Sequence, residues 1–259
     1  MTDKSNVLLE SHLKTLRLPT FKNEYKRTAR QCGLENKNYE DFLLCLSEME
    51  TQNRETKANA RRIREAGFPA DKDLSSFDFS DAPKLNKRTI LQLAQCGYIS
   101  KKENIVFVGQ PGVGKTHLAI ALGREACARG KRVKFFTASG LATAYAEARE
   151  ERHVQRLENY ISKRNLIIVD ELGYVPLGQN AAENLFGFFS RCYESASLIV
   201  TTNLPFSEWP QVFGDERMAG ALLDRLTHRV HVIEIQGESY RLKASLKNRG
   251  GDDEKKQKD

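Results

Sequence analysis

The chain has 259 residues, of which 40% are hydrophobic and 29% charged, and its formal net charge at pH 7 is +7. This length suits one core domain with a smaller element beside it; no apolar run reaches the length of a membrane span, and the N-terminal segment lacks a signal-peptide core. The five cysteines are widely spaced and include no C-x-x-C pair, which argues against a disulfide framework or a zinc site and predicts a reducing, cytoplasmic location.

The first part of the chain has the pattern of three helices. Leucines repeat at helical spacing until Pro19 ends the run, and a second helix is expected over residues 20–31. Asn38 is a good N-cap for a third helix, which continues towards Gly67 and is basic in its later portion. We therefore expect a small all-helical N-terminal domain over residues 1–68.

A connecting segment and then a core domain follow. Residues 69–83 contain prolines, serines and several aspartates, which is typical of a linker. A helix over residues 84–95 is expected to open the core domain, which we place at 84–249. The charged and glycine-containing tail, 250–259, is expected to be disordered.

The core domain alternates apolar strands with helices. The expected strands are 105–108, 133–136, 166–169, 198–201 and 230–235. The expected helices are 117–129, 138–163, 180–194, 217–226 and one that begins at 238. Because apolar strands that alternate with helices form a parallel sheet covered on both faces, we predict an α/β fold.

Residues 109–116 read Gly-Gln-Pro-Gly-Val-Gly-Lys-Thr and match the G-x-x-x-x-G-K-[ST] phosphate loop at every defined position. The strand before it and the helix after it give the context that this motif requires. In such a loop backbone N–H groups surround a polyphosphate, Lys115 reaches the β- and γ-phosphates, and the Thr116 hydroxyl binds Mg²⁺. The sequence therefore predicts a nucleoside triphosphate site. Its expected binding residues are Gly109, Gln110, Pro111, Gly112, Val113, Gly114, Lys115, Thr116 and His117.

Acidic and amide side chains follow two later strands. Asp170 and Glu171 come directly after strand 166–169, where Asp170 is expected to orient the Mg²⁺ shell and Glu171 to polarise the attacking water. If strand 198–201 lies beside the phosphate-loop strand, Asn203 can bond to the γ-phosphate or to that water. The simpler alternatives are a capped strand end for the acids and an ordinary turn for Asn203.

Two arginines near the end of the core domain suit phosphate recognition. Arg225 lies on an expected helix, and Arg241 lies at the start of the last one. A guanidinium group stays charged and pairs with phosphate oxygens through its planar fork, although most arginines of a basic protein are simply solvated. Residues 77–79 and those near Ile99 lie in the right part of the chain for an adenine pocket, and they would equally suit core packing.

These motifs, in this order and spacing, resemble the AAA+ ATPases of the helicase-loader clade. They are the phosphate loop, Val-Asp-Glu (169–171), Thr-Thr-Asn (201–203), Asp-Arg-Leu (224–226) and Glu-Ser-Tyr-Arg (238–241). The nearer resemblance is to the IstB-like subfamily, the ATPase encoded beside the transposase in certain bacterial insertion sequences. It extends over nearly the full chain and includes Leu-Pro-Thr-Phe (18–21), Phe-Asp-Phe (77–79), Gly-Tyr (173–174) and Asn-Leu-Pro-Phe (203–206).

The resemblance implies ATP and Mg²⁺ as cofactors and a role for each matching residue. The implied catalytic set is Lys115, Asp170, Glu171, Asn203, Arg225 and Arg241, with Thr116 and Asp170 on the metal. Asn203 would be the first sensor, and Arg241 the second sensor in its own subunit. Arg225 would be an arginine finger that reaches the γ-phosphate of a neighbouring subunit. A finger in trans requires ATP sites at subunit junctions, so the resemblance implies a homo-oligomer.

The resemblance also implies double-stranded DNA and a transposase as partners. Contacts to DNA phosphates would be largely independent of base sequence and sensitive to salt. For every candidate the alternative is an ordinary solvated helix face paired with nearby glutamates. The candidates are Lys57, Arg61, Arg62, Arg64, Arg149, Arg152, Arg156, Lys163 and Arg164.

The function implied is an ATP-dependent regulator of DNA transposition. It would assemble on target DNA, recruit or stimulate its transposase, and come apart on ATP hydrolysis. One alternative is a replicative helicase loader, but the N-terminal region offers only Cys32 and Cys45 and no zinc-ligand cluster. A second is a P-loop kinase that acts on a small molecule, although the acidic pair, Asn203 and the two late arginines favour hydrolysis by water.

Overall fold

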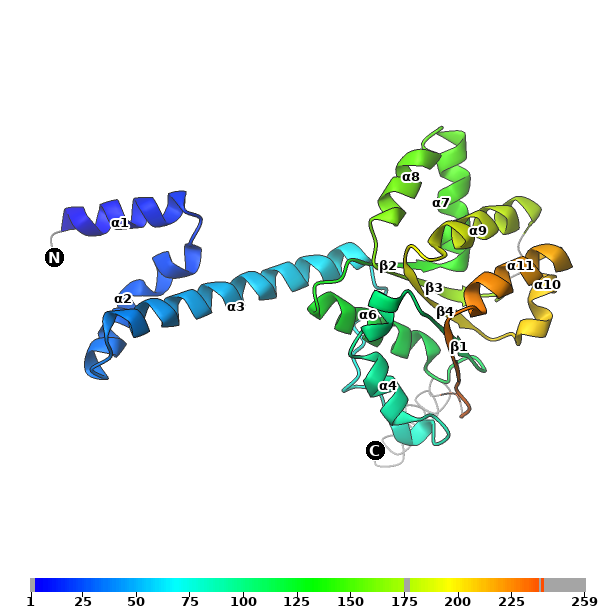
Figure 1. The fold of residues 1–259 in the computed structure, drawn as a ribbon, viewed down its shortest axis with the longest axis horizontal. Helices are drawn as coiled ribbons and strands as arrows, with labels where there is room; N and C mark the ends of the chain where they lie inside the picture. The colour runs from blue at the N-terminus through cyan, green and yellow to red at the C-terminus, as the bar shows by residue number, and fades with distance from the viewer. Residues whose placement is uncertain (1–2, 175–177, 238, 240–259) are drawn as a thin grey trace, which may run out of the picture. The chain divides into compact units, whose positions relative to one another are not determined.

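The computed structural model describes residues 3–174, 178–237 and 239 of the chain (Figure 1). The chain divides into two compact units, residues 1–61 and residues 62–259. Helix α3 (Tyr39–Ala66) begins in the first unit and ends in the second. The expected helix from 238 and the expected tail at 250–259 lie outside the described residues.

The first unit is all-helical, as the sequence predicts. It contains α1 (Asp3–Thr15), α2 (Pro19–Leu34) and most of α3. Asn38 is the N-cap expected for α3, since its side-chain oxygen accepts a 2.7 Å hydrogen bond from the Asp41 N–H. The described helices, here and in the second unit, include none with the length and apolar character needed to cross a lipid bilayer.

The second unit is built on a parallel five-stranded sheet, which confirms the predicted fold class. Its strands are β1 (Asn104–Val108), β2 (Val133–Thr137), β3 (Leu166–Leu172), β4 (Ser197–Thr202) and β5 (Val230–Glu234). They lie in the order β2-β3-β4-β1-β5, and each pair is parallel. The carboxyl ends of β1, β3 and β4 therefore meet at one edge of the sheet.

Helices cover both faces of this sheet (Figure 1). Ile105, Phe107 and Ile168 pack in one apolar cluster with residues of α4, α5 and α6, and Val106 and Val169 pack in the opposite cluster with α7, α9 and α11. This alternation follows from the two-residue period of a strand. The helices are α4 (Lys87–Leu93), α5 (Gly97–Lys101), α6 (Lys115–Ala128), α7 (Ala138–Glu150), α8 (Val154–Ser162), α9 (Gln179–Cys192), α10 (Trp209–Phe213) and α11 (Glu216–Thr227).

Helices α5 and α10 are not expected from the sequence, and two of the expected helices differ in the structure. The single helix expected over 138–163 is divided into α7 and α8, because Arg152 between them has a left-handed backbone with φ of 57°. The helix expected from residue 84 begins only at Lys87, where Asn86 caps it by accepting a hydrogen bond from the Thr89 N–H.

Candidate functional site

The phosphate loop lies between β1 and α6, as the motif requires. Gly112 and Gly114 have φ of 86° and 100°, a region that residues with a β-carbon rarely enter. A β-carbon at Gly112 would also collide with Ser239 Oγ. Lys115 Nζ donates hydrogen bonds to the carbonyl oxygens of Gly109 (2.7 Å) and Gln110 (2.9 Å), which holds its ammonium group over the loop.

The acidic pair lies beside this loop. Asp170 is only 3% exposed, and its carboxylate accepts hydrogen bonds from Thr116 Oγ1, at 2.9 and 3.1 Å. Glu171 is exposed and has a left-handed backbone with φ of 60°, at an irregularity in the pairing of β3 with β4. Such a conformation in a non-glycine residue is strained and is often found at functional sites.

Thr201 on β4, which is not among the residues predicted from the sequence, joins the two acids. Its Oγ1 donates a 2.5 Å hydrogen bond to Asp170 Oδ1 and accepts one of 2.9 Å from the Glu171 N–H. Thr201 is buried, so its hydroxyl is committed to these contacts. Its signs in the sequence are a hydroxyl residue after the apolar run 198–200 and its place in the Thr-Thr-Asn motif (201–203).

The side chains around Asp170 fit a magnesium ion. The three hydrogen bonds that the described residues give its carboxylate all come from the hydroxyls of Thr116 and Thr201, which leave its charge unneutralised. A buried, uncompensated carboxylate is unfavourable, and carboxylate and hydroxyl oxygens are ligands that Mg²⁺ accepts. Thr116 and Asp170 would therefore hold the ion.

Asn203 emerges next to the phosphate loop. Strand β4 pairs with β1, with Thr202 opposite Val108, and the Gly109 N–H donates a 3.2 Å hydrogen bond to the Thr202 carbonyl oxygen. The condition attached to Asn203, that its strand lies beside the phosphate-loop strand, is therefore met. Lys115, Thr116, Asp170, Glu171 and Asn203 all lie at the same edge of the sheet.

A cavity of about 750 Å³ opens at the loop. One side of it is lined by the loop and the first turns of α6, and the other by residues from 69 to 82. Phe77 and Asp78 line the cavity, so this part of the chain remains a candidate for the adenine pocket. Ile99 is buried in the apolar core, so this residue is core packing instead.

Arg225 lies away from this cluster. Its guanidinium group donates to the Ala221 carbonyl oxygen (2.9 Å) and lies over the Phe186 ring. The end of α11 is attached to the amino end of β1, since the Asn104 side chain donates a 3.0 Å hydrogen bond to the Leu226 carbonyl oxygen. Arg225 therefore lies at the opposite end of β1 from the phosphate loop. Arg241 lies outside the described residues.

Comparison with known proteins identifies the family of this chain. The family model described as "IstB-like ATP binding protein" matches residues 11–248. The chain belongs to the IstB-like ATP-binding family. A protein of Geobacillus stearothermophilus, described as an ATP-binding protein of insertion sequence IS5376, is 37% identical over 88% of this chain and 91% of its own length. The corresponding IS21 protein of Pseudomonas aeruginosa is 36% identical over 92% of this chain and 90% of its own.

Two solved structures have a fold similar to that of this IstB-like chain. AMPPCP-bound DnaA from Aquifex aeolicus has a TM-score of 0.55 at 20% identity, over 66% of this chain and 51% of its own. DnaI has a TM-score of 0.54 at 18% identity, over 68% of this chain and 94% of its own. At these identities the similarity concerns the fold alone, and the fold is the one predicted.

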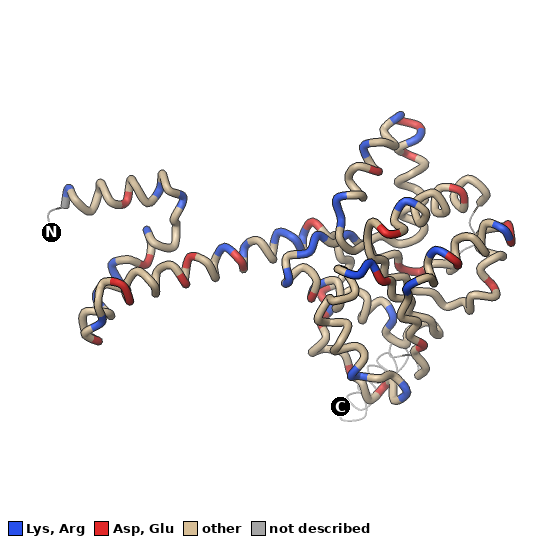
Figure 2. Tube along the Cα trace, in the orientation of Figure 1, with Lys and Arg blue, Asp and Glu red and all other residues tan. Residues whose placement is uncertain are grey.

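The candidate DNA contacts from 149 to 164 lie on α7, on α8 and in the residues that follow each of these helices, where Figure 2 shows basic residues among acidic ones. Arg149, Arg152, Arg156 and Lys163 are all exposed there. Arg164 is half-buried and lies 4.1 Å from the centre of the Tyr160 ring. On α3, Lys57, Arg61 and Arg64 are exposed, whereas Arg62 Nε donates a 2.7 Å hydrogen bond to the Cys127 carbonyl oxygen.

Proposed function

We propose that this IstB-like protein is an ATP-hydrolysing assembly factor for DNA transposition. It assembles on double-stranded target DNA, recruits or stimulates a transposase, and comes apart after hydrolysis. The observation that carries the enzymatic part is the cluster of Thr116, Asp170, Thr201 and Glu171 beside the phosphate loop. The names of the relatives, which tie them to insertion sequences, support the biological part.

Hydrolysis requires a held phosphate chain and an activated water. The loop N–H groups and Lys115 bind the β- and γ-phosphates, once Lys115 exchanges its loop carbonyls for phosphate oxygens. Magnesium, held by Thr116 and Asp170, would offset the charge that develops on the phosphate oxygens. Glu171 accepts the proton of the attacking water, and Asn203 hydrogen-bonds that water or the γ-phosphate.

The position of Arg225 supports a role in a neighbouring subunit. Because it lies at the far end of β1 from its own phosphate loop, it reaches a γ-phosphate only if two subunits pack end to end. An arginine finger of this kind contributes about 10³- to 10⁵-fold to turnover, so an isolated subunit hydrolyses ATP slowly. Arg241 is proposed as the second sensor of its own subunit, because Ser239, two residues before it, packs against Gly112.

The DNA partner is supported by the exposed basic residues of α7 and α8 and by the net charge of +7. Contacts of this kind bind phosphates and read no bases, so the proposed DNA binding is largely independent of base sequence. The helicase-loader alternative shares the same core, but the family and the named relatives favour transposition. For the small-molecule kinase, the described residues offer no feature in its favour beyond the phosphate loop.

A direct test measures ATP turnover and particle mass for the wild type and for Lys115→Ala, each with and without duplex DNA. The wild type should form large particles and accelerate turnover only when ATP and DNA are both present. Lys115→Ala should do neither, because it cannot hold the phosphate chain. A wild type that stays monomeric, and whose ATP turnover ignores DNA, would contradict the proposal.

A further inference from the structure

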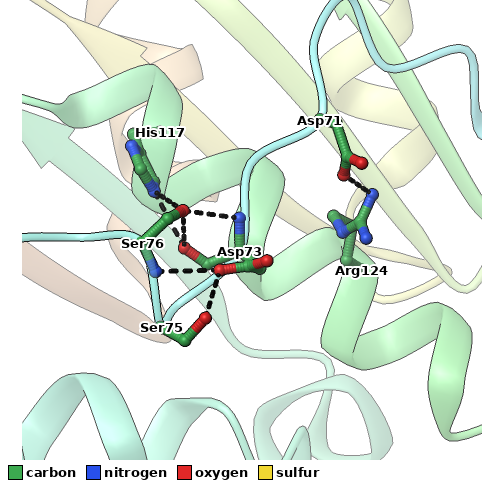
Figure 3. A network of polar contacts seen from close by, with 6 residues as sticks. All are labelled: Asp71, Asp73, Ser75, Ser76, His117 and Arg124. Atoms are coloured by element: carbon green, nitrogen blue, oxygen red, sulfur yellow. Dashed lines mark hydrogen bonds and ion pairs between the residues drawn. The ribbon is translucent and has the colours of Figure 1, made fainter.

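His117, the residue after Thr116, connects α6 to the segment 69–82. Its Nε2 lies 2.8 Å from the Asp73 carbonyl oxygen and 3.3 Å from Ser76 Oγ (Figure 3). A carbonyl oxygen only accepts hydrogen bonds, so Nε2 carries the hydrogen and donates it. Two turns further along α6, Arg124 forms an ion pair with Asp71 of the same segment (Figure 3).

Close apolar contacts show the direction of this segment. A β-carbon on Gly123 would fall 2.9 Å from the Phe68 ring, and one on Gly114 would fall 2.6 Å from the Phe77 ring. The segment therefore runs antiparallel to α6, from Gly123 back to the phosphate loop. Phe77 also packs edge-on against the His117 ring, with 5.3 Å between ring centres.

The part of the segment that His117 contacts is a preformed turn. The Asp73 carboxylate accepts hydrogen bonds from the Ser75 hydroxyl (2.7 Å) and the Ser76 N–H (2.8 Å), and these bonds lower the pKa of Asp73 to about 2. The Ser76 hydroxyl donates back to the Asp73 carbonyl oxygen at 3.0 Å. Because the turn is held by its own hydrogen bonds, one contact from His117 positions it as a unit.

This turn leads directly into the wall of the nucleotide cavity. Ser76, Phe77 and Asp78 line the cavity from the segment, while Lys115, Thr116 and His117 line it from α6. We propose that His117 is a positioning residue that holds this wall against the phosphate loop and so encloses the nucleoside part of ATP. The inference rests on the proposed binding of ATP in this cavity, and it gives His117 no contact with the reacting phosphate.

The test compares two ligands of the full-length chain, ATP and inorganic tripolyphosphate, by calorimetric titration with Mg²⁺. Tripolyphosphate should contact only the phosphate loop, whereas the nucleoside part of ATP should also contact the wall that contains Ser76, Phe77 and Asp78. His117→Ala should weaken ATP binding about tenfold, the effect of removing one hydrogen bond, and change tripolyphosphate binding less than about twofold. His117→Gln keeps an N–H donor and should recover most of the ATP affinity. His12→Ala, a change at an exposed histidine of α1, is the matched control and should bind like wild type.

A second measurement follows the segment itself. Lys72 is exposed within it, so tryptic cleavage after Lys72 should become several-fold faster in His117→Ala and return towards the wild-type rate in His117→Gln. Two results would overturn the role of His117. One is that His117→Ala weakens the binding of ATP and of tripolyphosphate equally, which indicates a damaged loop. The other is that the ATP affinity and the cleavage rate are both unchanged in this variant. A wild type that binds ATP without hydrolysing it would contradict the proposed function. The comparison of the ATP and tripolyphosphate affinities would still test the role of His117.

Discussion

Thr201 Oγ1 and Asp170 Oδ1 lie 2.5 Å apart, and the same hydroxyl accepts the N–H of Glu171. One side chain of β4 thus fixes both acids at the end of β3. The hydrogen bond to the Glu171 N–H also supports a backbone that is otherwise unfavourable, with φ of 60°. The direction of the Glu171 carboxylate therefore depends on a neighbouring strand as well as on its own.

Thr201→Val should separate binding from hydrolysis. Valine has nearly the shape of threonine but leaves Asp170 and the Glu171 N–H without their partner, so we expect ATP turnover to fall about tenfold to a hundredfold. The ATP dissociation constant should change less than about threefold, because the phosphate loop is untouched. Thr201→Ser, which keeps the hydroxyl, should restore most of the turnover; a Val variant with wild-type turnover would show that Thr201 does not position the acids.

DNA affinity should depend on salt through α7 and α8. In the double variant Arg149→Ala, Arg156→Ala, the slope of log affinity against log salt should become less steep by about 0.9 for each DNA phosphate that the variant no longer binds. Arg88→Ala, Lys101→Ala removes the same charge from exposed positions on α4 and α5 and is the control. Identical slopes in the two double variants would show that α7 and α8 do not bind phosphates.

Buried thiols should be protected in the folded protein. Burial raises the pKa of Cys127 to about 11 and that of Cys192 to about 12, from 9.0, so thiolate is scarce at pH 8. Half-exposed Cys45 should react first with a thiol reagent, and Cys127 and Cys192 only after unfolding.

The same shifts make a contribution to stability that depends on pH. Because the pKa of each buried thiol is higher in the folded state than its ordinary value of 9.0, protonation of the thiol stabilises the folded state. This stabilisation is fully present below pH 9 and is lost as the pH rises towards 12. The fall in melting temperature between pH 9 and pH 11 should therefore be smaller in Cys192→Ala than in wild type. An equal fall in the two proteins would contradict the burial of this thiol.

The sequence predicts the features that consecutive residues encode. The phosphate loop, the alternation of apolar strands with helices, and the Asn38 cap each depend on neighbours in the chain, and the structure has all three. Thr201 is not predicted because its partner, Asp170, lies 31 residues away and is brought near only by strand order.

The segment 69–83 illustrates the same limit. Its prolines, serines and aspartates have the composition of a linker, and composition carries no information about partners. In the structure two of these aspartates hold the segment against α6. The Asp71 carboxylate pairs with Arg124, and the backbone carbonyl oxygen of Asp73 accepts a hydrogen bond from His117. Likewise, no local pattern reveals that Arg225 lies at the far end of β1 from the phosphate loop.

The most direct test of the account mixes two inactive proteins. Arg225→Ala keeps an intact acidic pair, and Glu171→Gln keeps an intact Arg225, so each should bind ATP and hydrolyse it poorly on DNA. If Arg225 acts on a neighbouring subunit, about one junction in four of an equimolar mixture combines an intact Glu171 with an intact Arg225. The mixture should therefore recover up to about a quarter of the wild-type turnover. A mixture as inactive as its two components would contradict hydrolysis at subunit junctions.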